Sequence, residues 1–164
     1  VPEEVAAAML DEVLAAIGYA HDHSVIHLDL KPSNIMISSE GQIKVLDFGI
    51  ASKADELDKG AIMGSPMYMS PEQINGKGID RRSDIYGLGV TFHQMLTGRL
   101  PYPTNISRDE LFKRIRNSQL PRLNKFIPWA SKTAQLIIDK ATAKQPANRF
   151  DSCRAFQEAI IELR

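Results

Sequence analysis

The chain has 164 residues, 43% of them apolar, a length and composition typical of one globular domain around a single core. Lys and Arg together number 20, as do Asp and Glu, so the formal charge is zero and neither nucleic acid nor an anionic membrane is an expected partner. Cys153 is the only cysteine, which excludes an internal disulfide and a multi-cysteine zinc site and favours a cytoplasmic location.

The first part of the chain is predicted to contain one helix and three short strands. Apolar residues recur at helical spacing from Pro2 to about His21, which predicts a buried amphipathic helix whose apolar face is formed by Val5, Met9, Val13, Ile17 and Ala20. Runs rich in Ile and Val predict strands at Val25–His27, Asn34–Ser38 and Ile43–Leu46. Turn residues at 39–41 separate the last two strands, so we expect them to form a hairpin.

A long loop is expected in the middle of the chain. Residues 50–69 show no regular period and contain Gly60, Gly64 and Pro66. Loops of this length are often functional. Ser70 then has the right chemistry to cap a helix with Pro71 at its first position.

The remainder of the chain is predicted to be helical. One helix is expected over residues 82–97, before Gly98, and others are expected to start near Ser107, Ser131 and Asp151. Glu110 is placed to complete a capping box with Ser107, and Trp129 is assigned to packing. The expected fold class is therefore mainly α with a small β-hairpin region.

Polar residues with phosphoryl-transfer chemistry gather at the ends of the predicted strands. Asp29 is a candidate base, Lys31 is a nearby cation, and Asn34 and Asp47 offer the hard oxygen ligands that Mg²⁺ prefers. Taken alone, residues 47–49 are more typical of an ordinary strand-to-turn transition, since three-residue motifs recur by chance. The eight-residue segment 27–34 is far more specific, and it precedes that motif with a hairpin between them.

These two segments resemble the catalytic loop and the metal-binding loop of eukaryotic-type protein kinases. The resemblance continues along the chain in family order, at the motifs Gly64–Tyr68, Ser70–Glu72, Ser83–Gly89 and Pro146–Arg149. It covers the whole chain but only the large, C-terminal lobe of a kinase. The expected fold is thus the C-lobe of a protein-kinase-like fold, as one domain over residues 1–164.

The resemblance implies a role for each motif residue in transfer from ATP. Asp29 would accept the proton of a substrate hydroxyl, and Lys31 would neutralise charge on the transferring phosphate. Asn34 and Asp47 would bind Mg²⁺. Met36 matches the position that forms the floor under adenine, although simple strand packing is the alternative. The substrate-docking residues would be Ser65 and Pro66.

Other motif residues are expected to serve the structure. In the family, His27 would pack beneath Phe48, and Gly49 would let the chain turn sharply. Asp84 would hold the catalytic-loop backbone, and Arg149 would pair with Glu72. Ser70–Glu72 could also be a generic helix start, and the charges at 72 and 149 could be unrelated and solvated.

Two positions favour the serine/threonine subgroup, and a third indicates unusual regulation. Lys31 and Ser65 both match serine/threonine kinases, so the expected partner is a protein substrate. Leu28 stands where many kinases have an arginine that grips a phosphorylated activation loop. Since Ser52 is the only hydroxyl residue between positions 50 and 64, we expect activity that does not depend on loop phosphorylation.

The kinase small lobe has no counterpart in this sequence. A Gly-rich phosphate loop, a strand lysine and its glutamate partner would be expected before the first helix. We therefore expect the N-lobe of the same parent chain as a partner, and little catalysis by these residues alone. The alternative is a catalytically silent, kinase-like scaffold. The amino-acid sequences of residues 67–73 and 97–102 resemble those of bacterial members of the family.

Other sequence features carry weaker signals. His21 and His23, taken with His27, make an improbable zinc site because the spacing crosses a helix end and a strand. The basic residues at 81–82 and 113–116 are expected to be solvated helix faces. No apolar stretch is long enough to span a bilayer, and the amino terminus lacks signal-peptide features, so no membrane contact is expected from this segment.

Overall fold

Helices dominate the structure, a computed structural model that describes residues 1–48, 52–53 and 64–164. The helices are α1 (Glu3–Asp22), α2 (Pro71–Asn75), α3 (Arg81–Thr97), α4 (Arg108–Asn117), α5 (Lys132–Ala141) and α6 (Cys153–Ile160). The strands are β1 (Val25–Ile26), β2 (Ile35–Ile37), β3 (Ile43–Val45) and β4 (Ser52–Lys53). The prediction of a mainly α fold with a small β-hairpin region is confirmed.

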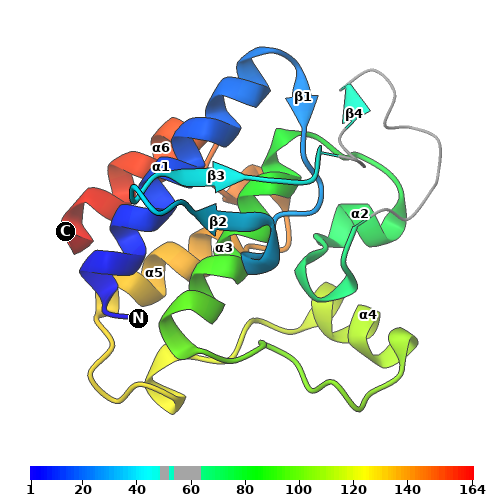
Figure 1. Cartoon of the computed structure of the whole chain (residues 1–164). Helices are drawn as coiled ribbons and strands as arrows, with labels where there is room; N and C mark the ends of the chain where they lie inside the picture. The colour runs from blue at the N-terminus through cyan, green and yellow to red at the C-terminus, as the bar shows by residue number, and fades with distance from the viewer. Residues whose placement is uncertain (49–51, 54–63) are drawn as a thin grey trace.

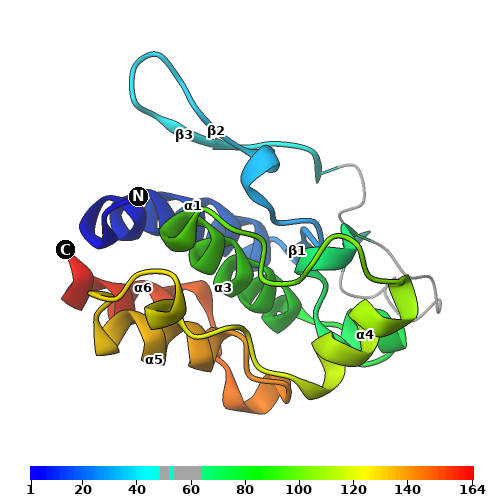
Figure 2. The same ribbon diagram turned by 90° about the horizontal axis from the view of Figure 1, so that it is seen from below.

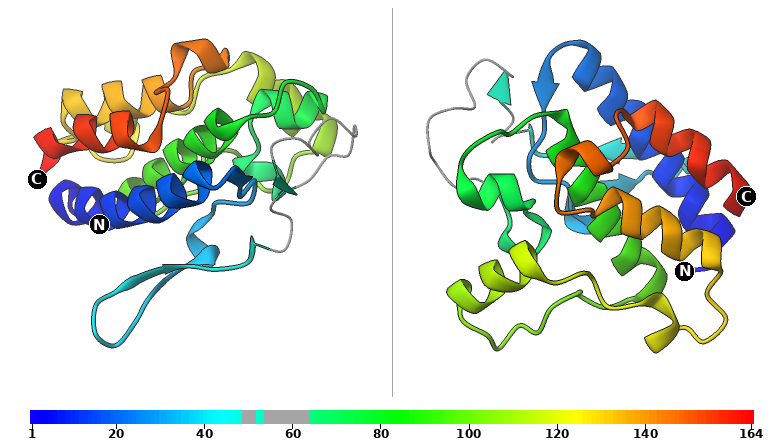
Figure 3. Two further views of the ribbon diagram at one scale, coloured as in Figure 1. Left: turned by 90° about the horizontal axis from the view of Figure 1, so that it is seen from above. Right: turned by 180° about the vertical axis from the view of Figure 1, so that it is seen from behind.

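The core forms around α3, which is buried along most of its length between α1 and α5 (Figure 1). Helix α6 packs against α1 and α5 on the opposite side of the molecule from the hairpin, as Figure 2 and Figure 3 show. Gly89 makes the contact between α3 and α5 close, because a Cβ there would lie 2.8 Å from both Ala141 Cβ and Thr142 Cγ2. Both termini lie at the same end of this helical layer.

The buried face of α1 differs from the predicted one by about one residue. It is formed by Ala6, Ala7, Leu10, Val13, Leu14 and Ile17. Val5 is 45% exposed, and Met9 and Ala20 are only partly buried. Alanine and leucine occur on several faces of this helix, so the sequence defines an apolar stripe but not its centre, which is set by contacts with α3 and α6.

The predicted hairpin is confirmed as an antiparallel pair of β2 and β3, with Ile35 opposite Val45 and Ile37 opposite Ile43. It projects from the helical body, as Figure 2 shows. The prediction that residues 50–69 form a loop throughout was wrong in two respects: Pro66–Tyr68 form a 3-10 turn, and an earlier pair of residues forms a strand. Ser52 and Lys53 form β4, which pairs antiparallel with β1. Two residues are too few to produce a periodic signal, so this pairing becomes visible only when the distant strand is in place.

The predicted helix starts were close to those observed. Ser70, Ser107 and Ser131 each cap their helix with a side-chain oxygen, whereas α6 is capped by Ser152 and not by Asp151. The assignment of Trp129 to packing was wrong, because its side chain is 84% exposed. An indole is usually buried, but nothing in the local sequence fixes which side of a loop faces the core.

Candidate active site

The backbone of the segment 27–34, which resembles a catalytic loop, is held by Asp84 in the first turn of α3. One carboxylate oxygen accepts from the Leu28 N–H at 2.8 Å, and the other accepts from the His27 N–H at 2.9 Å. His21, in the last turn of α1, contacts the second oxygen at 2.7 Å. Asp84 is 1% exposed, so this carboxylate is enclosed by its donors and fixes the loop relative to α3.

Asp29 stands at the centre of a small polar cluster formed by two segments. Its Oδ1 accepts from the Ser65 backbone N–H at 2.9 Å, and its Oδ2 lies 3.6 Å from Lys31 Nζ. Lys31 Nζ also donates to Ser65 Oγ at 2.6 Å. The Asn34 amide donates to the Asp29 carbonyl at 2.8 Å and to Oδ2 at 3.3 Å. The structure thus brings together four of the predicted site residues, Asp29, Lys31, Asn34 and Ser65.

The charge state of Asp29 follows from these contacts. Burial raises the pKa of the carboxyl group, but the hydrogen bonds from Ser65, the charge of Lys31 and the Asn34 amide outweigh burial and leave the pKa below its ordinary value. Asp29 is therefore an ionised acceptor at neutral pH. An ionised carboxylate beside a lysine ammonium can orient a hydroxyl group and accept its proton.

His27 connects this cluster to the second motif. Its ring packs edge-on against Phe48 with centroids 4.5 Å apart, its Nε2 contacts the Leu46 carbonyl at 3.0 Å, and its Nδ1 accepts from the Asp29 N–H at 3.1 Å. The Leu46 N–H donates to the Asn34 carbonyl at 2.8 Å. Asp47 follows directly and adopts a positive φ of 58°. The predicted role of Gly49, and most of the loop concerned with phosphorylation, lie outside the described residues.

Met36 and Pro66 lie on the surface around the cluster. The Met36 side chain, on β2, is 53% exposed, so strand packing does not account for it. Pro66 is exposed and begins a 3-10 turn over Pro66–Tyr68, directly after Ser65.

The Glu72 and Arg149 side chains form a buried, bidentate ion pair. Arg149 donates to the two Glu72 carboxylate oxygens at 2.5 and 2.8 Å, and Ser83 Oγ donates to Oε1 at 2.7 Å. Arg149 also donates to backbone carbonyls, including that of Arg82. The alternative of two unrelated solvated charges was wrong, and α2 is thereby attached to α3 and to the loop before α6.

A family model described as the protein kinase domain matches residues 1–161. The chain belongs to the protein kinase family. It is 35% identical over 155 residues to the serine/threonine-protein kinase PrkC of Bacillus subtilis and 39% identical over 164 residues to the serine/threonine-protein kinase Pkn1 of Myxococcus xanthus; each alignment covers 93% of this chain. It is 31% identical to the serine/threonine-protein kinase PknB of Mycobacterium leprae over 99% of this chain. The alignments cover 24%, 23% and 26% of those proteins, so this kinase chain spans about a quarter of their length.

Several contacts of this candidate site were not predicted from the sequence. His21 supports Asp84, Gln73 Nε2 donates to the Leu28 carbonyl at 3.1 Å, and Thr91 Oγ1 donates to the Leu30 carbonyl at 3.1 Å. The two carbonyls belong to the backbone and could come from any residue type. The one sequence signal for these contacts is a polar residue at a position where the helix pattern predicts an apolar one, such as Thr91 in the middle of α3.

The histidines and the basic clusters have protein contacts of their own. His23 Nδ1 contacts the Tyr19 carbonyl, and His21 and His27 are engaged as described above. In the described residues, the charges at 113–116 lie on the outer side of α4, where Arg114 pairs with Glu110. The described ranges contain no helix with the length and apolar character needed to cross a bilayer.

Proposed function

We propose that this chain supplies the catalytic loop, the metal-binding loop and the substrate-facing segment of an ATP-dependent protein serine/threonine kinase. The observation that carries the proposal is the convergence of Asp29 and Lys31 with Ser65, which follows them by 36 and 34 positions in the sequence. The membership of the chain in the kinase family and the names of its relatives support the same assignment.

In this proposal Asp29 orients the hydroxyl of a substrate serine or threonine. The hydroxyl oxygen forms a bond to the γ-phosphorus as the bond to the ADP oxygen breaks, and its proton passes to the Asp29 carboxylate. The lowered pKa of Asp29 makes it a weak base, so it receives the proton after the new oxygen–phosphorus bond has made the hydroxyl acidic. Lys31, 3.6 Å from Asp29, lies within reach of the charge on the transferring group.

The residues for a metal ion have suitable chemistry. Asn34 uses its amide nitrogen for Asp29, which leaves Oδ1 without a hydrogen bond from the described residues. An amide oxygen together with the Asp47 carboxylate is a donor set that suits Mg²⁺. When bound, Mg²⁺ would neutralise charge on the phosphates of ATP. The exposed Met36 side chain would contact the adenine ring.

The remaining parts of the proposal concern partners and location. The N-lobe of the parent chain would complete the ATP site, and Ser65 and Pro66 would face the protein substrate. The balanced charge and the single cysteine support a cytoplasmic kinase domain.

The test is phosphate transfer from Mg²⁺-ATP to a generic protein substrate, with the parent chain and its Asp29→Asn variant. Asp109→Asn is the matched control, because Asp109 is exposed in the first turn of α4. Transfer by the parent chain and the control that disappears in Asp29→Asn supports a kinase with Asp29 as its base. ATP binding without transfer would overturn the proposal in favour of a catalytically silent scaffold.

A further inference from the structure

The Gln73 side chain joins the start of α2 to the catalytic loop. Gln73 is 3% exposed, and both ends of its amide are used. Its Oε1 accepts from the Ser70 N–H at 3.0 Å and from Ser70 Oγ at 3.2 Å, and its Nε2 donates to the Leu28 carbonyl at 3.1 Å. One buried amide therefore connects the capping box of α2 with the residue that precedes Asp29.

The Leu28 carbonyl belongs to the peptide unit that links Leu28 to Asp29. Because a peptide unit is planar, the direction of this carbonyl fixes the direction in which the Asp29 N–H and Cα leave. Leu28 has a positive φ of 66°, a conformation that leucine rarely adopts. Asp84 holds its N–H at 2.8 Å and Gln73 holds its carbonyl, so both polar groups of this unusual residue are fixed by side chains.

Gly64 closes the other side of the Leu28 carbonyl. A Cβ at position 64 would lie 2.6 Å from the Leu28 oxygen and 3.3 Å from Gln73 Nε2. A carbonyl enclosed in this way requires a donor from the protein, and Gln73 supplies it. The next residue along the chain, Ser65, donates its N–H to Asp29 Oδ1. The backbone before Asp29 and the carboxylate of Asp29 are thus held by neighbouring parts of one segment.

We propose that Gln73 is a positioning residue for phosphoryl transfer. Its amide N–H sets the plane of the Leu28–Asp29 peptide unit, and through that unit it aims the Asp29 carboxylate at the substrate hydroxyl. Gln73 acts through Asp29 and contacts neither substrate nor phosphate. This inference rests on the proposed function, because it assigns Gln73 a part in the same reaction.

A single substitution separates this role from the capping role. A capping box needs only an acceptor at the third helical position, and glutamate serves there as well as glutamine. Gln73→Glu therefore keeps the acceptor for Ser70 and loses the donor to the Leu28 carbonyl. If Gln73 serves only the stability of α2, this variant should keep the wild-type kcat per folded molecule and the wild-type amide exchange over residues 27–31.

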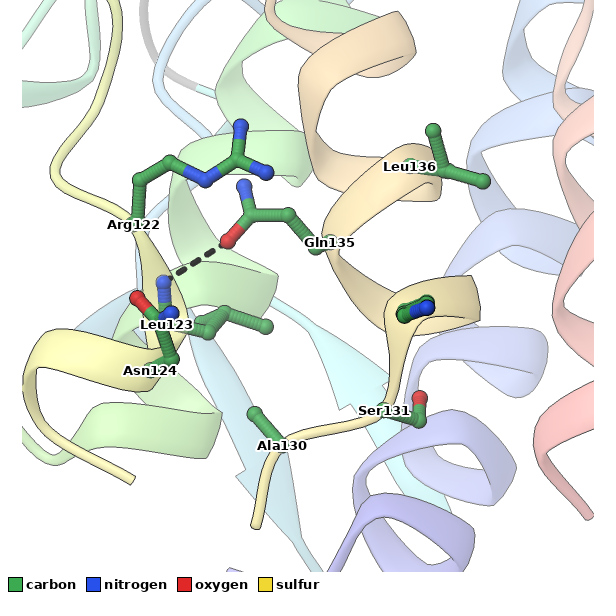
Figure 4. A pocket seen from close by; sticks show the side chains of 8 residues that line it. Arg122, Leu123, Asn124, Ala130, Ser131, Gln135 and Leu136 are labelled. Carbon is green, nitrogen blue, oxygen red and sulfur yellow. Dashed lines mark hydrogen bonds between the residues drawn. The ribbon is translucent and has the colours of Figure 1, made fainter. Parts of the chain in front are cut away.

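Gln135 provides a matched control away from the catalytic loop. It is 8% exposed, its Oε1 accepts from the Leu123 N–H at 2.7 Å, and its Nε2 donates to Asp139 Oδ1 at 2.8 Å. Figure 4 shows this amide between α5 and the segment that carries Arg122 and Leu123. Gln135→Glu also removes a donor from a buried amide that joins a helix to a loop. Gln135 is more than 100 positions from Asp29, and its hydrogen bonds go to Leu123 and Asp139.

The experiment compares steady-state phosphate transfer by the parent chain and by its Gln73→Glu and Gln135→Glu variants. We expect kcat of Gln73→Glu to fall by about tenfold to 100-fold, because a misplacement of about 1 Å in a reacting group costs that much. KM for ATP should change by less than about threefold, since ATP binding uses other groups. The control should keep kcat, per folded molecule, within about twofold of the wild type.

Two further measurements distinguish a role of Gln73 in positioning Asp29 from a purely structural role. The ratio of variant to wild-type kcat should rise as the pH falls, because the introduced carboxyl group can donate to the Leu28 carbonyl once it is protonated. Amide hydrogen exchange over residues 27–31 should be faster in Gln73→Glu and unchanged in Gln135→Glu.

The outcomes can be told apart. Unchanged kcat in Gln73→Glu, or unchanged exchange over residues 27–31, overturns the positioning role. A wild-type parent chain that transfers no phosphate would instead overturn the proposed function. In that case the exchange measurement still decides whether Gln73 orders the backbone before Asp29.

Discussion

Arg149 and Glu72 lie 77 positions apart in sequence and meet in a buried ion pair with two hydrogen bonds. The pair joins the loop that precedes α6 to the short helix α2. It therefore attaches the segment that carries Ser65 and Gln73 to the helical core, where α3 also holds the catalytic loop through Asp84.

Removal of one partner should be costly, because the other charge is left buried. We expect Arg149→Leu to lower the free energy of unfolding by about 3–5 kcal/mol, measured by urea denaturation of the parent chain. Arg154→Leu is the control, since Arg154 is 88% exposed and its pair with Glu158 should contribute less than about 0.5 kcal/mol. Equal losses in both variants would contradict a special role for the buried pair.

Acid should weaken the same pair. Burial raises the pKa of Glu72, but the hydrogen bonds and charge of Arg149 outweigh it and leave the pKa below its ordinary value of 4.5. The unfolded state therefore takes up a proton first, and the contribution of the pair is fully present above about pH 4.5 and is lost as the pH falls through the lower folded value. Unfolding titrations below pH 5 should be steeper for the wild type than for Glu72→Gln.

Lys144 should destabilise the folded state at neutral pH. Its Nζ is buried with no hydrogen-bond partner in the described residues and lies 5.7 Å from the centroid of the Tyr86 ring. Burial and the nearby Arg149 charge lower its pKa from 10.5 to about 8. Between these two values the unfolded state binds more protons, so stability should rise with pH.

The variant Lys144→Met tests this sign. It should be more stable than the wild type at pH 7, and the difference should shrink as the pH is raised from 8 to 10, in urea titrations at each pH. A difference that does not vary with pH would mean that Lys144 has an ordinary pKa in the folded protein.

Gly64→Ala should weaken the contact between the segment that starts at Gly64 and the catalytic loop. The new Cβ would lie 2.6 Å from the Leu28 carbonyl, and Gly64 has a positive φ of 111°. We expect a loss of about 2 kcal/mol or more in the free energy of unfolding. Gly78→Ala shares the positive φ but meets nothing within 4 Å, so its loss should be only about 1 kcal/mol. A thermal or urea denaturation series compares the two.

Leu28→Arg should destabilise the kinase domain. Leu28 is 5% exposed and packs with Ile26 and Ile79 in a small apolar cluster. A guanidinium group in that cluster would lack a partner, and we expect a loss of about 3 kcal/mol. Leu28→Met keeps the apolar volume and should lose less than about 1.5 kcal/mol. Similar stability of the two variants would show that the arginine reaches solvent.

Much of the fold could be predicted because its signals are local. A serine before a helix, an apolar residue every three or four positions and a turn at 39–41 act over short distances, so the elements and the hairpin were placed correctly. The face of α1 and the exposure of Trp129 were predicted wrongly, because they depend on which elements pack nearby. The β1–β4 pair was missed because Ser52 and Lys53 form a strand only through a partner far away in the chain.

The sequence by itself determined which chemical groups the site contains. The order of Asp29, Lys31, Asn34 and Asp47 along two loops identifies the family without any coordinates. The resemblance also predicted that Asp84 holds the catalytic loop, but the tertiary structure alone decided that Gln73 and Thr91 bind its backbone carbonyls. Every residue except proline offers the same N–H and carbonyl to such partners. The sequence therefore does not identify which carbonyl groups these two side chains bind, and folding brings the donors and acceptors together.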